Sequence, residues 1–287
     1  MKLFFKYILS VLFVAFISLI IADIAYTYVY SNTVRNKFQF IRSYKDKKVD
    51  YIFLGSSRVE NGLNPRVVDS VLNKNTVNFG VQAAGVLDLK LILELIKDYN
   101  ITSECIYIQI DYIYNLPHKQ SNVLEYQLAP FIRESNYINN YYNSKENSLL
   151  LKYVPFMRYA MYDQKNGFRE FVANCFSKPY QAKKTKGFSA LYGFSEHETH
   201  KLPEFIIKEN KVFPALLDYI KSNNINVKFF CSPFRNDIKN LDYVEKLKVK
   251  IPDLIDYSKS IQDKKLFKDN YHLNNFGAKV FSQNFRP

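Results

Sequence analysis

The chain of 287 residues has no tryptophan, only three cysteines and only eight glycines. Cys105, Cys175 and Cys231 are too few for a disulfide scaffold, and their spacing does not indicate a metal site. Cys105 and Cys231 lie in apolar runs typical of strands, which favours a role as small core residues, with an isolated disulfide as the alternative. The absence of tryptophan, beside abundant tyrosine and phenylalanine, indicates no particular function.

Several nucleotide and metal motifs are also missing. The chain contains no Walker-type loop and no dinucleotide fingerprint, so no nucleotide cofactor is implied. It has no Cys/His finger and no RNA-binding motif, which argues against nucleic acid as a partner. The spacing of His197 and His200 differs from the His-Glu-x-x-His zinc motif and favours a polar surface loop. We therefore expect neither a cofactor nor a metal ion.

Acidic residues are outnumbered, with 27 Asp and Glu against 40 Lys and Arg, for a net charge of +13. Such an excess suits an anionic polymer or an anionic membrane surface, although a solvated lysine-rich surface is the favoured interpretation. The chain is 47% hydrophobic and 16% aromatic. It can therefore bury the core of one large domain or two small ones.

The N-terminal 30 residues predict a single-pass transmembrane helix. The run from Tyr7 to Ala22 holds no charge, and extending it to Tyr30 admits only Asp23. Lys2 and Lys6 precede the run, which predicts a cytoplasmic N-terminus and a main domain outside the cytoplasm, although a basic stretch at 31–48 follows. A cleaved signal peptide is the alternative, but the run is long for one and no A-x-A site follows. We expect an uncleaved anchor in the cell membrane, with 31–48 as a juxtamembrane helix or linker.

From residue 49 onward, short apolar runs typical of buried strands alternate with helical patterns. Strands are expected at 49–54, 76–79, 105–110, 227–231 and 255–258, and helices at 65–73, 87–99, 203–222 and 276–285. This alternation predicts an α/β domain over 49–287, with a central parallel sheet covered on both faces in a three-layer αβα sandwich.

Residues 116–202 interrupt the alternation. The segment is rich in aromatic residues and too long for a plain loop, so it predicts a helical insertion. A lid or substrate platform beside the site and a packing elaboration are equally good interpretations.

Two polar segments, more than two hundred residues apart, predict a serine acyl-transfer site. Ser57 follows the first expected strand in a Gly-Ser-Ser-Arg turn, and Asp269 and His272 stand three residues apart before the last helix. A serine nucleophile needs a base, and the base needs an orienting group. Our hypothesis gives Ser57, His272 and Asp269 these roles, with Ser56 capping the turn and Arg58 as a surface residue.

The loop at 78–85 contains small residues that permit close approach of the backbone. Its N–H groups suit an oxyanion hole, in which donors stabilise the charge of a tetrahedral intermediate. The candidate donors in this loop are Gly80, Ala83 and Gly85.

These segments resemble the blocks of the SGNH (GDSL-type) hydrolase superfamily. Gly55-Ser56-Ser57 is similar to the first block, with Ser56 where the family more often has Asp. Asn78-Phe79-Gly80 is similar to the second block, and the segment from Asp269 to Gly277 is similar to the last. The resemblance covers about 49–287 apart from the insertion. It implies a flavodoxin-like fold, Ser57 as the nucleophile and an oxyanion contact from the Gly80 N–H.

The third block departs from the family. The family usually has Gly-x-Asn-Asp after the third strand, with Asn as an oxyanion donor, whereas this chain has Ile110-Asp111-Tyr112-Ile113-Tyr114-Asn115. An ionised Asp111 cannot donate a hydrogen bond. Asn115 is therefore the remaining side-chain candidate for the third contact.

The resemblance and the anchor together imply a membrane-anchored serine esterase or O-acyltransferase. Its substrate class would be an acylated glycan or an anionic polymer of the cell envelope, as for similar anchored relatives including the D-alanylation-associated type, with a membrane acyltransferase as a partner. The alternative is a domain that kept the fold and lost turnover, serving as a binding or assembly partner. A Ser57 Oγ within hydrogen-bond range of a His272 ring nitrogen would favour the enzyme. The acyl group, the acceptor, hydrolysis against transfer and the oligomeric state are left open.

Overall fold

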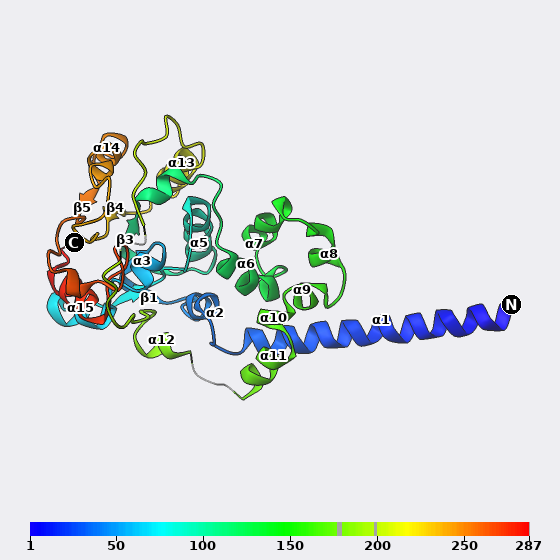
Figure 1. Cartoon of the computed structure of the whole chain (residues 1–287). Helices are drawn as coiled ribbons and strands as arrows, with labels where there is room; N and C mark the ends of the chain where they lie inside the picture. Colours follow the sequence, from blue (N-terminus) through cyan, green and yellow to red (C-terminus); the bar gives the residue numbers. More distant parts are fainter. Residues whose placement is uncertain (177–179, 198–199, 287) are drawn as a thin grey trace. The chain divides into compact units, whose positions relative to one another are not determined.

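The computed structural model describes residues 1–176, 180–197 and 200–286 (Figure 1). The chain forms two compact units. Unit 1 comprises Met1–Gln39 and Glu125–Pro179, and unit 2 comprises Phe40–Leu124 and Tyr180–Pro287. This division differs from the predicted boundaries, because part of the expected insertion belongs with the N-terminal helix and the rest with the sheet.

Unit 2 is built on one sheet of five strands. The strands are β1 (Lys48–Leu54), β2 (Thr76–Asn78), β3 (Thr102–Gln109), β4 (Val227–Cys231) and β5 (Ile255–Asp256). Their order is β2-β1-β3-β4-β5, and every neighbouring pair is parallel. The prediction of an α/β domain with a central parallel sheet is confirmed, and all five strands lie within two or three residues of their expected positions.

The helices of unit 2 follow the strands in alternation. They are α3 (Ser57–Glu60), α4 (Pro65–Leu72), α5 (Val86–Asp98), α12 (Gln181–Lys184), α13 (Val212–Ser222), α14 (Tyr243–Lys250) and α15 (Asn275–Asn284), with 3-10 turns η1 (Tyr112–Asn115) and η4 (Lys264–Leu266). The helix expected at 203–222 begins only at Val212. The Asn210 Oδ1 accepts hydrogen bonds from the backbone N–H groups of Val212 and Phe213, so the chain turns into the helix at that point.

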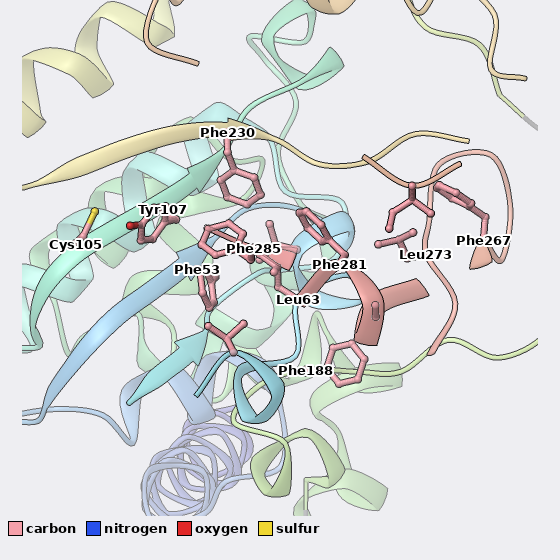
Figure 2. Packing of buried hydrophobic residues seen from close by; sticks show 14 residues of the cluster. Phe53, Leu63, Cys105, Tyr107, Phe188, Phe230, Phe267, Leu273, Phe281 and Phe285 are labelled. Carbon is pink, nitrogen blue, oxygen red and sulfur yellow. The ribbon is translucent and has the colours of Figure 1, made fainter. Parts of the chain in front are cut away.

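A core of aromatic side chains fixes the C-terminal segment on the sheet (Figure 2). The ring of Phe285 lies 5.2 Å from that of Phe53 in β1, 5.1 Å from Tyr107 in β3 and 5.9 Å from Phe230 in β4. One residue after α15 thus contacts three neighbouring strands, and the segment leading into α15 is held against the sheet. Cys105 and Cys231 are buried free thiols and Cys175 is an exposed one, in agreement with the expected core role of the first two.

Unit 1 is helical. The first helix, α1 (Lys2–Ser31), is long and apolar enough to cross a membrane. The others are α7 (Asn136–Tyr141), α8 (Ser148–Tyr153), α9 (Met157–Ala160), α10 (Asp163–Asn166) and α11 (Phe168–Cys175), with 3-10 turns η2 (Ala129–Phe131) and η3 (Tyr142–Ser144); α2 (Lys37–Arg42) and α6 (Asn122–Leu128) lie at the boundaries of the units.

The inserted helices pack on the C-terminal part of α1. Asp23, Tyr26 and Tyr30 are buried, and the Tyr26 ring stacks on Phe171 of α11 at 4.1 Å. These contacts explain why α1 and residues 125–176 form one unit. The stretch at 31–48, expected as a juxtamembrane helix or linker, contains the short helix α2, whose Phe38 and Ile41 are fully buried.

Candidate active site

The turn after β1 is fixed by buried hydrogen bonds around Ser56. The Gln109 Oε1 accepts from the Ser56 N–H at 3.0 Å and from the Ser56 hydroxyl at 2.9 Å. The Ser56 Oγ in turn accepts from the Arg58 N–H and caps α3. At Gly55, a Cβ would lie 2.4 Å from a methyl group of Val59, so only glycine fits. Ser56 therefore caps the turn, as expected, and Ser57 stands next to it with a partly exposed side chain.

The turn that carries Asp269 and His272 is closed by an antiparallel bridge between Phe267 and Leu273. Both bridge residues are buried in the core of Figure 2. Inside the turn, the Asp269 Oδ1 accepts from the backbone N–H groups of Tyr271 and His272, each at 2.8 Å. The spacing of three residues thus places the Asp269 carboxylate next to the His272 imidazole. The bridge between Phe267 and Leu273 fixes the two ends of this segment.

The two turns bring Ser57, His272 and Asp269 together. The Ser57 Oγ lies 2.9 Å from the His272 Nε2, and the His272 Nδ1 lies 3.1 Å from each carboxylate oxygen of Asp269. With the ring proton on Nδ1 donated to Asp269, the Nε2 lone pair faces the serine hydroxyl. This is the arrangement in which imidazole can accept a proton from serine while a carboxylate holds its tautomer.

The environment keeps Asp269 ionised. Partial burial by itself raises the pKa of the carboxyl group, but the hydrogen bond and charge of His272 and the two backbone N–H donors outweigh it. The net result is a pKa lowered from 3.8 to about 2. A carboxylate that stays charged in this way can stabilise an imidazolium when His272 takes up a proton.

Arg58 is buried, in contrast to the surface position that we expected for it. Its side chain is 1% exposed and pairs with the fully buried Asp111. The Nε donates to the Tyr271 carbonyl at 3.0 Å, and Nη2 donates to the carbonyls of Ser232 and Pro233 at 2.9 and 2.5 Å. Arg58 thus joins the serine turn to the ends of two strands and to the turn that carries His272. Its fork of several donors explains why a charged side chain is stable in this interior position.

Asp111 acts as a hydrogen-bond acceptor. In addition to Arg58, the Gln109 Nε2 donates to its Oδ2 at 2.5 Å, and the Ile113 N–H donates to its Oδ1. Its carboxylate therefore completes the buried network after β3 and offers no donor to an oxyanion, as the sequence indicated.

Three of the four expected oxyanion donors have partners inside the fold. The Gly80 N–H donates to the Asn78 Oδ1 at 2.9 Å, and the Gly85 N–H donates to the Asp88 Oδ2 at 2.8 Å. The Asn115 amide donates to the Phe205 carbonyl and accepts from the Ile207 N–H and the Tyr243 hydroxyl. The Asn115 side chain thus fixes the segment before α13, and one N–H of its amide is used in that contact.

Ala83 differs from the other three. Its φ of +58° is in the left-handed region, and no acceptor for its N–H is recorded among the described residues. The loop that carries it runs beside the serine turn, since the Val81 N–H donates to the Gly55 carbonyl at 2.9 Å and the Gln82 amide donates to Asn61. Of the residues that the sequence indicated, Ala83 is the one that keeps a backbone donor in this loop.

An aromatic stack next to the triad escaped the sequence analysis. The Tyr271 ring, between Asp269 and His272, stacks on Tyr112 at 4.9 Å and on His200 at 4.4 Å. Burial raises the pKa of Tyr271 to about 12, so its hydroxyl, which donates to the Lys201 carbonyl, stays protonated. The position of Tyr112 directly after β3 was the available signal, because the ends of parallel strands share one edge of the sheet.

Within the described ranges, no group of three or more His, Cys, Asp or Glu side chains is placed to hold a metal ion. Glu198 and Thr199, between the two histidines that we considered as ligands, lie outside the described residues.

A scan against models of protein families found no match to this chain, and a search of curated proteins found no relative. The assignment of a function thus depends on the geometry of the site and on the resemblance of its sequence blocks.

Proposed function

We propose that the chain is a membrane-anchored serine esterase or O-acyltransferase of the SGNH type. The single observation that carries the proposal is the contact of 2.9 Å between the Ser57 Oγ and the His272 Nε2, with Asp269 on the other ring nitrogen. The proposed fold is a three-layer sandwich. The strand order, which is the flavodoxin-like order, and the contacts of α4 with α15 and of α5 with α13 support it.

In the proposed reaction, the Ser57 Oγ attacks the carbonyl carbon of an acyl ester while His272 takes the hydroxyl proton. Collapse of the tetrahedral intermediate breaks the ester bond, and His272 returns the proton to the leaving alcohol. The acyl-enzyme then transfers its acyl group to water or to a sugar hydroxyl, which His272 deprotonates in the same way. Asp269 stabilises the imidazolium in both steps.

The oxyanion of the intermediate needs hydrogen-bond donors near Ser57. We assign this role to the backbone N–H groups of Ser57 and Ala83. Ser57 is the first residue of α3, where a backbone N–H has no acceptor within the helix, and no other acceptor for it is recorded among the described residues.

The anchor part of the proposal is that α1 is retained and crosses the cell membrane once, with the main domain outside the cytoplasm. Signal peptidase cleavage beyond Tyr30 would remove Asp23, Tyr26 and Tyr30, whose side chains fill the interior of unit 1. An acylated glycan or anionic polymer of the cell envelope is the substrate class that fits this location and the net charge of +13, with a membrane acyltransferase as the partner.

A fluorophosphonate probe tests the serine directly. We expect the folded full-length protein to be labelled, and mass spectrometry of its peptides to locate the label on Ser57. Ser57→Ala should abolish labelling, whereas Ser56→Ala, which removes the neighbouring buried hydroxyl, should keep the label on Ser57 at a lower rate. Labelling that survives in Ser57→Ala would exclude this serine as the nucleophile.

The second candidate is a non-catalytic domain that binds an envelope polymer or takes part in its assembly. The engaged N–H groups of Gly80 and Gly85 and the engaged amide of Asn115 favour it, because they leave fewer oxyanion donors than the family resemblance implied. A folded wild-type protein that is not labelled, yet binds an acylated envelope polymer with an affinity unchanged in Ser57→Ala, would support this candidate.

A further inference from the structure

The helix α1 has two parts with different surroundings. Every residue from Met1 to Leu19 is exposed, and most of these side chains are apolar. From Ile20 onward one stripe at helical spacing becomes buried, with Asp23, Tyr26 and Tyr30 as its members. The first part has no protein around it and suits a lipid environment, whereas the second part is a core element of unit 1.

The uncharged run of α1 is short for spanning a bilayer. The uncharged run from Tyr7 to Ala22 extends about 24 Å as a helix. The hydrocarbon core of a bilayer is about 30 Å thick, and the difference is taken up by thinning of the bilayer or by the flanking residues. The first turns that contact unit 1 must therefore lie at the membrane interface, and so must the groups of unit 1 that surround Asp23.

Asp23 accepts hydrogen bonds from the start of α9 and from Arg133. Its carboxylate accepts from the Phe156 N–H at 3.0 Å, from Arg158 at 2.8 Å and from Arg133 at 3.1 Å. Arg133 also donates to the carbonyl of Lys152 in α8 at 3.0 Å. The C-terminal end of α8 is therefore tied to the level of Asp23 along α1.

α8 has an apolar outer face at this level. Leu149 and Tyr153 are each 72% exposed and Leu150 is 41% exposed, whereas Leu151 is buried. The spacing of 149, 150 and 153 places these side chains on one side of the helix. In Figure 1, α8 is the element of unit 1 that lies furthest along α1 toward the N-terminus. Leucine and tyrosine are residue types that bind at the boundary between lipid headgroups and acyl chains.

We propose that this α8 apolar face (Leu149, Leu150 and Tyr153) inserts into the interface of the bilayer that α1 crosses, on the side where α1 emerges into unit 1. Lipid is a better occupant than a second copy of the chain, because a stable dimer buries about 800 Å² on each partner, more than three side chains of a six-residue helix provide. The inference rests on the membrane anchor of the proposed function and is independent of its acyl chemistry.

The absence of tryptophan permits a direct test, since one introduced tryptophan is the only one in the chain. The full-length Tyr153→Trp protein is reconstituted into phosphatidylcholine and phosphatidylglycerol vesicles whose acyl chains carry bromine either near the headgroup or near the chain end. We expect bromine near the headgroup to quench the tryptophan most strongly. Leu149→Trp should behave in the same way.

Phe176→Trp is the matched control. Phe176 is 76% exposed and lies two residues after Asn174, which accepts a hydrogen bond from Thr33, just beyond the C-terminal end of α1 and ten residues after Asp23. We expect bromine near the headgroup to reduce the emission of Tyr153→Trp at least about twofold more than that of Phe176→Trp. Phe13→Trp, in the middle of the apolar run, should be quenched best by bromine near the chain end.

Three results would overturn the inference. Equal quenching of Tyr153→Trp and Phe176→Trp, with Phe13→Trp quenched, would leave the anchor intact and remove the α8 apolar face from the membrane. A blue-shifted Tyr153→Trp emission that is lost on dilution to one protein per vesicle would assign the face to a second copy. Absence of quenching in Phe13→Trp would disprove the anchor itself, whereas fluorophosphonate labelling reports on the acyl chemistry separately.

Discussion

Each of the two units contains a buried ion pair between an arginine and an aspartate. In unit 2, Arg58 and Asp111 join the serine turn to the end of β3, and Arg58 also holds the Tyr271 carbonyl beside His272. In unit 1, Arg158 and Asp23 join α9 to the apolar helix α1. Both arginines also donate to further acceptors, which compensates the cost of removing the charges from water.

The difference lies in what each pair connects. The first pair connects segments that carry the candidate catalytic side chains, so its geometry affects the distance between Ser57 and His272. The second pair connects the apolar helix α1 to the helices that pack on it, so its geometry sets how the helices of unit 1 are held together. Loss of the first pair should affect reactivity and stability together, whereas loss of the second should affect stability alone.

The largest effect is expected from the group that orients the histidine. Asp269→Asn should lower the rate of ester turnover by roughly 10⁴-fold, because the amide can stabilise the wrong imidazole tautomer and cannot compensate an imidazolium. Hydrolysis of a chromogenic acetyl ester measures this rate. Asp263→Asn, which affects a cap of the neighbouring turn η4, is the control and should retain turnover. A turnover rate in Asp269→Asn within a factor of ten of the wild type would argue against the triad.

The next effect concerns the ion pair of unit 2. Arg58→Met should destabilise unit 2 by about 3–5 kcal/mol, because Asp111 is left as a buried charge without its partner. The serine and histidine segments should separate as well, so that fluorophosphonate labelling falls. Hydrogen exchange of peptides from 48–111, together with the labelling rate, measures both. The double variant Arg58→Met with Asp111→Leu removes both charges and should recover stability without recovering labelling.

The matching change in unit 1 is Arg158→Met. Its cost should lie at the lower end of about 3–5 kcal/mol, because Arg133 and the Phe156 N–H still bind Asp23. Hydrogen exchange should increase in peptides from 125–176, while the rate of fluorophosphonate labelling on Ser57 should not change. A large loss of labelling in this variant would show that the two ion pairs do not have separate roles.

The smallest effect is a pH dependence of stability. The pKa of Asp269 is lowered from 3.8 to about 2, so its interactions stabilise the folded state fully above about pH 4 and are lost as the pH falls toward 2. The difference in unfolding free energy between wild type and Asp269→Asn should therefore be constant from neutral pH to about pH 4 and shrink below it. Denaturant titrations at several pH values measure the difference. A difference that already disappears near pH 5 would contradict the lowered pKa.

Local sequence patterns were sufficient for most of the elements of unit 2. The apolar runs of β1, β3 and β4 are short and bounded by polar residues, and Pro65 marks the start of α4. The serine turn and the Asp269 to His272 spacing could also be recognised, because a strand end and a turn before a capped helix each have a local signature. The division into units could not be predicted, since it depends on the packing of residues 125–176 against a helix more than a hundred positions earlier.

Arg58 shows why the buried hydrogen bonds of the site could not be predicted from the sequence. In the sequence it is one of 40 basic residues, and nothing next to it distinguishes a buried arginine from a solvated one. Its acceptors come from 111, 232, 233 and 271, which only the folded sheet brings to one place. The same holds for Asn115. Its side chain forms hydrogen bonds with the backbone of Phe205 and Ile207, which lie about ninety residues away in the sequence.

The sequence by itself determined the alternation of strands and helices, the apolar N-terminal helix and the spacing of an aspartate and a histidine on one turn, because these follow from periodicity and from contacts between near neighbours. The tertiary structure decided that the hydroxyl of Ser57 meets the imidazole of His272, which donors remain available beside them, and that α1 shares a core with the helices of residues 125–176. Those outcomes depend on side chains far apart in the chain, whose burial and hydrogen bonding are settled only when the whole sheet and its helices have packed.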